Sequence, residues 1–497
     1  MLDFLRVKKM ETHYIDDLWI EGSGDEFVST DPATERINWK GRAATGKEVD
    51  AAYRAALRAF EKWSDLPAEE RIGYSQSFKE KVIEHRDELA ECISRESGKP
   101  LWESYTEVDA IVGKVGLSIE AHKERRHDAK QDLGGAASAL RYRPHGVIAV
   151  FGPFNLPGHL PHGHIIPALI AGNTVVFKPS EQAPLVAQKL MECWIEADLP
   201  PGVLNLVQGG RETGMAVAQS PLLAGLFFTG SVAAGRALHM SFAGQPEKII
   251  ALELGGNNPL IVTEIDDTES AAYIAVQSTY ITSGQRCTCA RRLVVPAGNE
   301  GDLFIAALMS LIDRIQIGPY TDTPEPFMGP VISRKARDEL LAAQERLSKQ
   351  GGRILTEMTS LDRPGHFLTP GLIDVTQVPD RPDEEIFGPL LQVIRVANFE
   401  QALHEANNTA FGLSAGLISR NPKLYERFRK RIRAGVVNWN RQTTGASGRL
   451  PFGGLGRSGN HRPSGFFAAD YCSDPVAYLE VERPATMPDR SIGIIPR

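Results

Sequence analysis

Cys287 is the residue of this 497-residue chain whose surroundings most clearly suggest chemistry. It stands in residues 283–292 (SGQRCTCARR), between small side chains and with arginines on both sides. Positive charge beside a cysteine lowers the pKa of its thiol, and the thiolate is the nucleophilic form. The run therefore predicts a reactive cysteine at position 287. From this local context alone, a buried structural cysteine is the alternative.

Two further residues could assist such a nucleophile. Glu253 ends an apolar run and precedes two glycines, Gly255 and Gly256. A partly desolvated carboxylate in that position has a raised pKa and can act as a general base. Asn155 follows another apolar run, and its amide could stabilise a developing oxyanion. A surface carboxylate and a turn-forming asparagine are the alternatives.

Two segments could bind a nucleotide. The apolar residues 174–177 lead into Lys178 and Glu181, which places a cation and a carboxylate where ligands of doubly wound sheets bind. Residues 225–228 lead into Gly230, Ser231 and a helix start through Gly235, whose amide groups could hold a pyrophosphate. An ordinary strand-to-helix turn is the alternative for the second segment.

The elements that must position these residues alternate between strand and helix. Residues 47–125 have helical periodicity, with a predicted helix start at 67–70. Beyond them, short β-branched runs recur with room for a helix between them, which favours βαβ units and parallel, doubly wound sheets. The predicted strands are 146–150, 174–177, 203–207, 225–228, 248–252, 259–262, 291–296, 390–396, 413–418 and 435–439.

Composition narrows the class of protein. With 55 basic and 62 acidic residues the net charge is −7, which gives no general attraction to nucleic acid or to anionic membranes. No apolar run approaches the length of about 18 residues that a membrane span needs. Five scattered cysteines indicate a reducing, cytoplasmic location. One residue between Cys287 and Cys289 is too few for a zinc pair, so no metal is predicted.

In order and spacing, these motifs resemble the aldehyde dehydrogenase superfamily. The resemblance also includes Glu385 and Phe387 in residues 385–389 (EIFGP), and it continues through 438–440 and 451–454. It covers the chain from about residue 17 onward.

The resemblance implies a role for each residue. Cys287 would be the nucleophile, Glu253 the base for the hydrolytic water, and Asn155 an oxyanion-hole donor together with the backbone N–H of Cys287. The implied cofactor is NAD rather than NADP, because a carboxylate at Glu181 would repel a 2′-phosphate. Its expected contacts are Lys178, Glu181, Gly230, Ser231, Val232, Ala233, Ala234, Gly235, Glu385 and Phe387.

The implied α/β fold is aldehyde dehydrogenase-like, with two doubly wound α/β domains and a small β oligomerisation flap. The expected ranges are 17–125 and 147–253 for the NAD-binding domain, 254–455 for the catalytic domain, and 126–146 and 456–497 for the flap. Because the flap would pair with a second subunit, a homodimer or larger homo-oligomer is expected.

Within the superfamily, residues 154–167 and 458–472, together with 284–292 and 438–441, resemble the N-succinylglutamate 5-semialdehyde dehydrogenases of arginine catabolism by the succinyltransferase pathway. Their substrate carries several carboxylates, which arginine recognises well. The predicted substrate residues are Arg286, Arg441, His461 and Arg462. Succinic or glutamate semialdehyde is an alternative substrate. A non-catalytic structural role is a further alternative, but the presence of Cys287, Glu253 and Asn155 favours catalysis.

Cys289 suggests a hypothesis of its own. Oxidation of Cys287 to a sulfenic acid could be captured by Cys289 as a reversible disulfide. Alternate residues of an extended strand lie about 6.6 Å apart, farther than the roughly 4.5 Å between the Cβ atoms of a disulfide. The loop would therefore have to bend. A packing role for Cys289 is the alternative.

Overall fold

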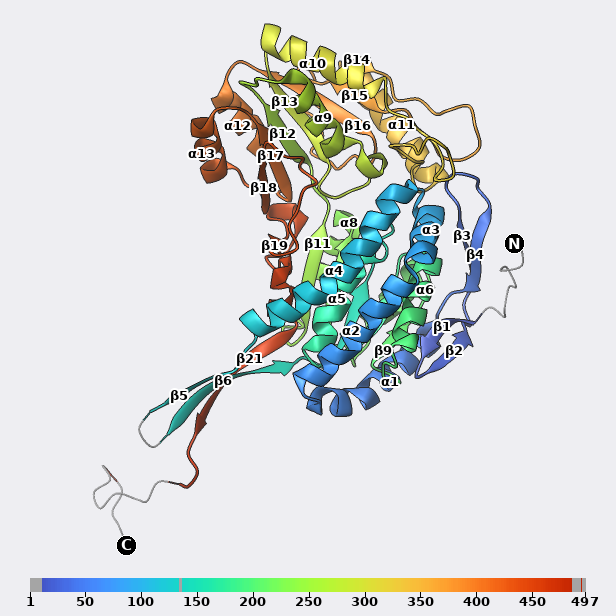
Figure 1. The fold of residues 1–497 in the computed structure, drawn as a ribbon, viewed down its shortest axis with the longest axis vertical. Coiled ribbons are helices and arrows are strands. Elements are labelled where there is room, and N and C mark those ends of the chain that lie inside the picture. The colour runs from blue at the N-terminus through green and yellow to red at the C-terminus, as the bar shows by residue number, and fades with distance from the viewer. Residues whose placement is uncertain (1–10, 134–135, 485–492, 494–497) are drawn as a thin grey trace.

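A seven-stranded sheet forms the centre of the first domain (Figure 1). The computed structural model describes residues 11–133, 136–484 and 493. The strand order is β11-β10-β7-β8-β9-β1-β2, and the first five strands in that order are parallel. Their bounds are β7 Val147–Phe151, β8 Thr174–Lys178, β9 Leu204–Leu206, β10 Gly225–Gly230 and β11 Ile249–Leu254, with β1 Glu11–Ile15 and β2 Leu18–Glu21 as an antiparallel edge.

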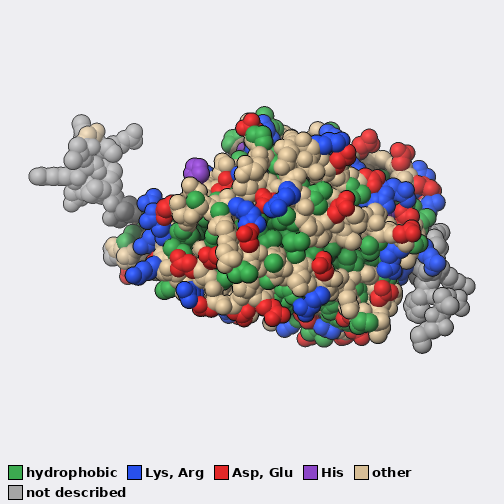
Figure 2. Space-filling view, turned by 90° about the horizontal axis from the view of Figure 1, so that it is seen from above, with side chains coloured by type: hydrophobic (Ala, Val, Ile, Leu, Met, Phe, Trp, Pro, Cys, Tyr) green, Lys and Arg blue, Asp and Glu red, His purple; other side chains and the backbone are tan. Residues whose placement is uncertain are grey.

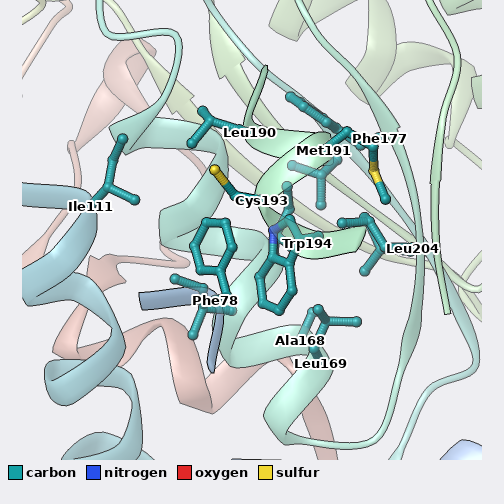
Figure 3. Packing of buried hydrophobic residues seen from close by; sticks show 14 of the residues in the cluster. Phe78, Ile111, Ala168, Leu169, Phe177, Leu190, Met191, Cys193, Trp194 and Leu204 are labelled. Carbon is teal, nitrogen blue, oxygen red and sulfur yellow. The ribbon is translucent and has the colours of Figure 1, made fainter. Parts of the chain in front are cut away.

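Helices cover both faces of this sheet. Alternate strand residues therefore belong to two different apolar clusters, as expected for a parallel sheet buried on both sides. In one cluster Phe78 stacks on Trp194 with ring centroids 3.9 Å apart (Figure 3). The helices are α1 Gly46–Asp65, α2 Ala68–Glu84, α3 Arg86–Ser97, α4 Leu101–Arg125, α5 His159–Ile170, α6 Pro184–Glu196, α7 Arg211–Ala218 and α8 Val232–Ser241.

The second domain contains another seven-stranded sheet, in the order β14-β15-β16-β13-β12-β17-β18. Only the edge strand β14 is antiparallel to its neighbour. The strands are β12 Asn258–Val262, β13 Ala290–Pro296, β14 Arg353–Thr356, β15 Gly371–Asp374, β16 Leu390–Val396, β17 Ser414–Ile418 and β18 Val436–Trp439. The helices are α9 Thr268–Thr279, α10 Asn299–Ile312, α11 Arg334–Lys349, α12 Phe399–Asn407 and α13 Pro422–Arg431.

These two sheets confirm the predicted fold class. All ten predicted strands are present, with ends that differ from the prediction by at most two residues. The helical region predicted at 47–125 is also confirmed, and its second helix begins at Ala68 after Pro67.

A three-stranded antiparallel sheet projects from the body of the molecule (Figure 1). Its strands are β5 Ala129–Asp132, β6 Ala137–Pro144 and β21 Ser473–Glu480. The expected flap range 456–497 is only partly in this sheet, because η3 Phe466–Tyr471 packs on α4 and residues 485–492 and 494–497 lie outside the described residues.

Short elements complete the described chain. They are the hairpin of β3 Glu26–Thr30 and β4 Ile37–Arg42, the pair β19 Pro451–Phe452 and β20 Ser464–Gly465, and the 3₁₀ turns η1 Ile281–Gly284 and η2 Gly456–Ser458. Figure 2 shows basic and acidic side chains interspersed over one face of the molecule. Among the described residues, no helix combines the length and apolar character needed to cross a membrane.

Candidate active site

A cavity of about 800 Å³ lies at the carboxyl ends of β7, β8, β10 and β11, where they meet the cysteine loop of the second domain. This is the edge of a doubly wound sheet at which ligands bind. Ten of the predicted site residues line this cavity: Asn155, Lys178, Glu181, Gly230, Ser231, Glu253, Arg286, Cys287, Glu385 and Phe387. Tertiary structure thus brings together side chains that lie more than two hundred positions apart in the sequence.

The cysteine loop has an unusual backbone. Thr282 and Ser283 adopt positive φ angles of 55° and 53°, and Gly284 follows with φ 72°. A Cβ at Gly284 would lie 2.1 Å from the carbonyl oxygen of Gly388. Only glycine fits both this angle and this close approach. The strained turn lifts the chain out of α9 and directs Cys287 into the cavity.

Asn258 at the start of β12 holds the far side of the loop. Its Nδ2 donates to the carbonyl oxygens of Cys287, at 2.7 Å, and Cys289, at 2.8 Å. Its Oδ1 accepts from the N–H of Ser414 at 2.9 Å, which fixes the orientation of the amide. Sequence analysis assigned Asn258 no role. Its backbone-binding function could be recognised only once the loop and the strand were adjacent.

The two arginines nearest to Cys287 hold the loop rather than the thiol. Arg286 pairs with the buried Glu103 carboxylate, Nη2 to Oε1 at 2.7 Å, and its Nε donates to Thr282 Oγ1. Arg291 is buried, and its guanidinium donates to the carbonyl oxygens of Gly284, at 2.6 Å, and Arg286, at 2.9 Å. Both cations are therefore occupied by partners other than the sulfur.

The expected low pKa of the Cys287 thiol is accordingly wrong. Burial raises its pKa to about 12, and the carboxylates of Glu385 and Glu253 raise it further, whereas Arg291 opposes them only in part. Negative charge close to a thiol disfavours the thiolate. Cys287 is thus mainly a neutral thiol at pH 7, and it must lose its proton before it can act as a nucleophile.

Glu253, at the end of β11, has the properties of a general base. One carboxylate oxygen accepts from the N–H of Ser464 at 3.2 Å, and the other is buried without a hydrogen-bond partner in the described chain. Burial raises the pKa of this carboxyl well above its usual value. Asn460 holds β11 in place by bonding the backbone of Ile250 and Leu252. The free oxygen is available to take a proton.

Asn155 is buried beside the cysteine loop, after β7. Its Nδ2 donates to the carbonyl oxygen of Gln285 at 2.9 Å, two residues before Cys287. The backbone N–H of Cys287 makes no hydrogen bond within the part of the chain that the structure describes. When the Cys287 sulfur adds to an aldehyde, the resulting oxyanion could accept hydrogen bonds from this N–H and from the Asn155 amide.

The opposite part of the cavity has the features of a nucleotide site. Lys178 Nζ lies 3.7 Å from Glu181 Oε2 at the end of β8. Ser231 caps α8 by accepting from the N–H of Ala234 at 3.2 Å, so the first amides of α8 face the cavity side. A Cβ at Gly235 would lie 2.3 Å from Leu254 Cδ2, so glycine allows α8 to pack closely on β11.

Glu385 and Phe387 border the site from the second domain. The Glu385 carboxylate accepts from the N–H of Gly256 at 3.0 Å, and a Cβ at Gly255 would lie 1.8 Å from that carboxylate. The Phe387 ring stands edge-on to Phe154, with centroids 6.0 Å apart. The part of the cavity in which a cofactor could bind is thus bordered by residues of both domains.

Not every predicted residue reaches the cavity. Arg441, His461 and Arg462 are exposed and do not line it, and Val232 to Gly235 continue into α8 behind Ser231. Among the cavity residues to which sequence analysis assigned no role are Lys114 of α4 and His159 of α5. A lysine in an amphipathic helix is expected to be exposed to solvent, so nothing in the sequence indicated that Lys114 would line the cavity.

Comparisons with known proteins identify the family of this chain. The family model of the aldehyde dehydrogenase family matches residues 19–475. Among similar solved structures are HpcC from Thermus thermophilus (32% identity, TM-score 0.89, covering 96% of this chain and 94% of that one), an NADP dependent enzyme from E. coli (30%, 0.89, 95% and 98%) and betaine aldehyde dehydrogenase from Staphylococcus aureus in complex with NAD+ (27%, 0.89, 97% and 97%). The chain is a member of the aldehyde dehydrogenase family.

Proposed function

We propose that this aldehyde dehydrogenase uses NAD to oxidise N-succinyl-L-glutamate 5-semialdehyde to N-succinyl-L-glutamate, in arginine catabolism. The observation that carries the chemistry is the meeting of Cys287, Glu253 and Asn155 on one cavity whose other part has nucleotide-binding features. A thiol, a base and an oxyanion donor are the groups that thioester chemistry requires.

Cys287, Asn155 and Glu253 each have a distinct role in the proposed reaction. The Cys287 thiol loses its proton to solvent, and its sulfur adds to the aldehyde carbon. The Asn155 amide and the Cys287 N–H stabilise the oxyanion of the thiohemiacetal. NAD, when bound, supplies a hydride acceptor. Glu253 then takes a proton from water, which attacks the Cys287 thioester and releases the carboxylic acid.

The residues present suit a dinucleotide. The amides at the start of α8 can bind a pyrophosphate, while Lys178 and Glu181 lie where ribose hydroxyls would be recognised. The S. aureus relative holds NAD+ and the E. coli relative is described as NADP dependent, so the family alone does not decide between the two. The exposed Glu181 carboxylate would repel a 2′-phosphate, which supports NAD.

The substrate proposal depends on the resemblance of residues 154–167 and 458–472 to succinylglutamate semialdehyde dehydrogenases. Succinic and glutamate semialdehyde are the alternative acidic substrates. Among the predicted substrate residues, Arg286 is engaged by Glu103, and Arg441, His461 and Arg462 lie outside the cavity, so they lend this choice no support.

We further propose a cytoplasmic homo-oligomer assembled through the projecting sheet. Leu479 of β21 is 80% exposed, and Leu133 and Val481 beside the same sheet are also exposed. Apolar side chains on a projecting sheet favour burial against a second subunit. Analytical ultracentrifugation should find a dimer or larger species.

The test is steady-state reduction of NAD and of NADP with a panel of aldehydes. We expect the highest kcat/KM with NAD and N-succinylglutamate semialdehyde. Higher values for neutral aliphatic aldehydes would overturn the substrate proposal. Absence of activity with every aldehyde, in a protein that binds NAD, would favour the non-catalytic alternative.

A further inference from the structure

Lys114 is a buried cation that lines the cavity without an ion-pair partner. It is 7% exposed, and no hydrogen bond or salt bridge to it exists among the described residues. The other cations at the cavity differ in this respect, since Lys178 faces Glu181 and Arg286 pairs with Glu103. The Glu107 carboxylate, which also lines the cavity, is occupied by Lys99. The cavity therefore carries one uncompensated positive charge on its α4 side.

His159 stands near this ammonium and is also unsatisfied. Its Nδ1 is buried and has no partner in the described chain. Burial lowers the pKa of this imidazole well below its usual value, and the charges of Lys114 and Arg286 lower it further. At pH 7 the ring is neutral and can donate one hydrogen bond. Lys114 and His159 both line the cavity, and each thus has a polar group without a partner in the described chain.

Gly163 of α5 lies beside the Lys114 ammonium. A Cβ at Gly163 would lie 3.8 Å from Lys114 Cε and 3.9 Å from Nζ, in ordinary van der Waals contact. Gly163 and Lys114 both line the cavity, so the cavity extends along this side of the ammonium.

A buried ammonium such as that of Lys114 is energetically unfavourable when no ligand compensates its charge. Burial lowers the pKa of Lys114 to about 8, so the ammonium remains mostly charged at pH 7. A buried charge is normally paired or hydrogen-bonded. A carboxylate at this point would compensate the ammonium and accept from the imidazole.

We propose that Lys114, assisted by His159, binds a carboxylate of the aldehyde substrate while the aldehyde carbon reaches Cys287. This inference rests on the proposed function and adds the residues that make it selective for acidic semialdehydes. The groups suited to cofactor phosphates come from β8, β10 and α8, whereas Lys114 and His159 come from α4 and α5. The anion expected here is therefore on the substrate.

The test compares Lys114→Met with the full-length wild type, using succinic semialdehyde and butanal as an acidic and a neutral four-carbon aldehyde. A charge-assisted hydrogen bond contributes enough to predict a loss of about 10- to 100-fold in kcat/KM for succinic semialdehyde, mainly through KM. Butanal should change less than about twofold, because it has no carboxylate to lose. Lys123→Met, on an exposed position of the same helix, is the matched control and should change neither substrate.

The outcomes separate the inference from the function on which it rests. If the wild type itself does not prefer succinic semialdehyde to butanal, the proposal of an acidic substrate fails. If the wild type has the preference and Lys114→Met keeps it, only the role of Lys114 is overturned. The role of Lys114 is likewise overturned if Lys114→Met loses activity equally with both aldehydes. Removing an unpaired buried charge should not lower Tm. If the methionine variant nevertheless fails to fold, Lys114→Gln provides the same comparison.

Discussion

Glu253→Gln should separate the two halves of the proposed reaction. Glutamine retains an oxygen for the 3.2 Å bond from the Ser464 N–H but cannot accept a proton from water. Loss of a general base costs about 10²- to 10⁴-fold, so steady-state turnover should fall by that factor. The first turnover should persist and release about one reduced cofactor per active site.

Alkylation of Cys287 in the Glu253→Gln variant measures how the Glu253 charge affects the thiol. Because burial raises the pKa of Cys287 to about 12, only a small fraction of its thiol is ionised at pH 8. Since Glu253 is one of two carboxylates that raise this pKa further, its removal should accelerate alkylation by iodoacetamide. Glu385→Gln is the matched control, since it removes the other carboxylate but leaves the base for hydrolysis.

Stopped-flow absorbance of the reduced cofactor and timed alkylation at pH 8 are the two assays. A lost burst together with slower alkylation would refute this reasoning, because Glu253 would then be indispensable for deprotonating the thiol. The wild type adds a pH test. Its Glu253 acts as a base only when ionised, so hydrolysis should be lost as pH falls through the raised pKa of that carboxyl.

Three other substitutions test the remaining assignments. Asn155→Ala should lower kcat about 10²- to 10³-fold, and an unchanged kcat would remove it from the oxyanion hole. Arg286→Ala leaves the buried Glu103 carboxylate uncompensated, so we expect a loss of about 3 kcal/mol in stability, measured by denaturant unfolding, with no change in the preference for acidic aldehydes. A fall in that preference alone would assign Arg286 to the substrate. After mild peroxide, thiol reductant should restore the wild type more fully than Cys289→Ser; equal recovery would mean that Cys289 only packs. The Cys289 N–H donates to the Arg286 carbonyl at 3.0 Å, so the backbone between the two cysteines turns rather than extends.

Much of the fold could be predicted because its strands are locally encoded. Most of the parallel strands are short apolar runs with buried side chains, which their hydrophobicity indicates. In the two large sheets, the strands β1, β2, β14 and the interior β15 were not predicted. β2 and β14 are short and partly exposed, whereas β1 and β15 are mostly buried but short. The pairing of these strands depends on distant segments rather than on their own composition.

The order of Asn155, Glu253 and Cys287 along the sequence was enough to indicate the family and the chemistry at these positions, because each follows a strand or loop signal that the chain itself contains. Their protonation was not determined by the sequence. Arg286 and Arg291 are neighbours of Cys287 in the chain, yet their guanidinium groups bind Glu103 and backbone carbonyls, while burial and the carboxylates of Glu385 and Glu253 raise the thiol pKa. Only tertiary structure decides this, since electrostatic effects depend on distance in space and on burial, and neither follows from neighbours in sequence. The same reason explains Lys114, an ordinary helix residue in the sequence that becomes an unpaired cation only when α4 and α5 close around the cavity.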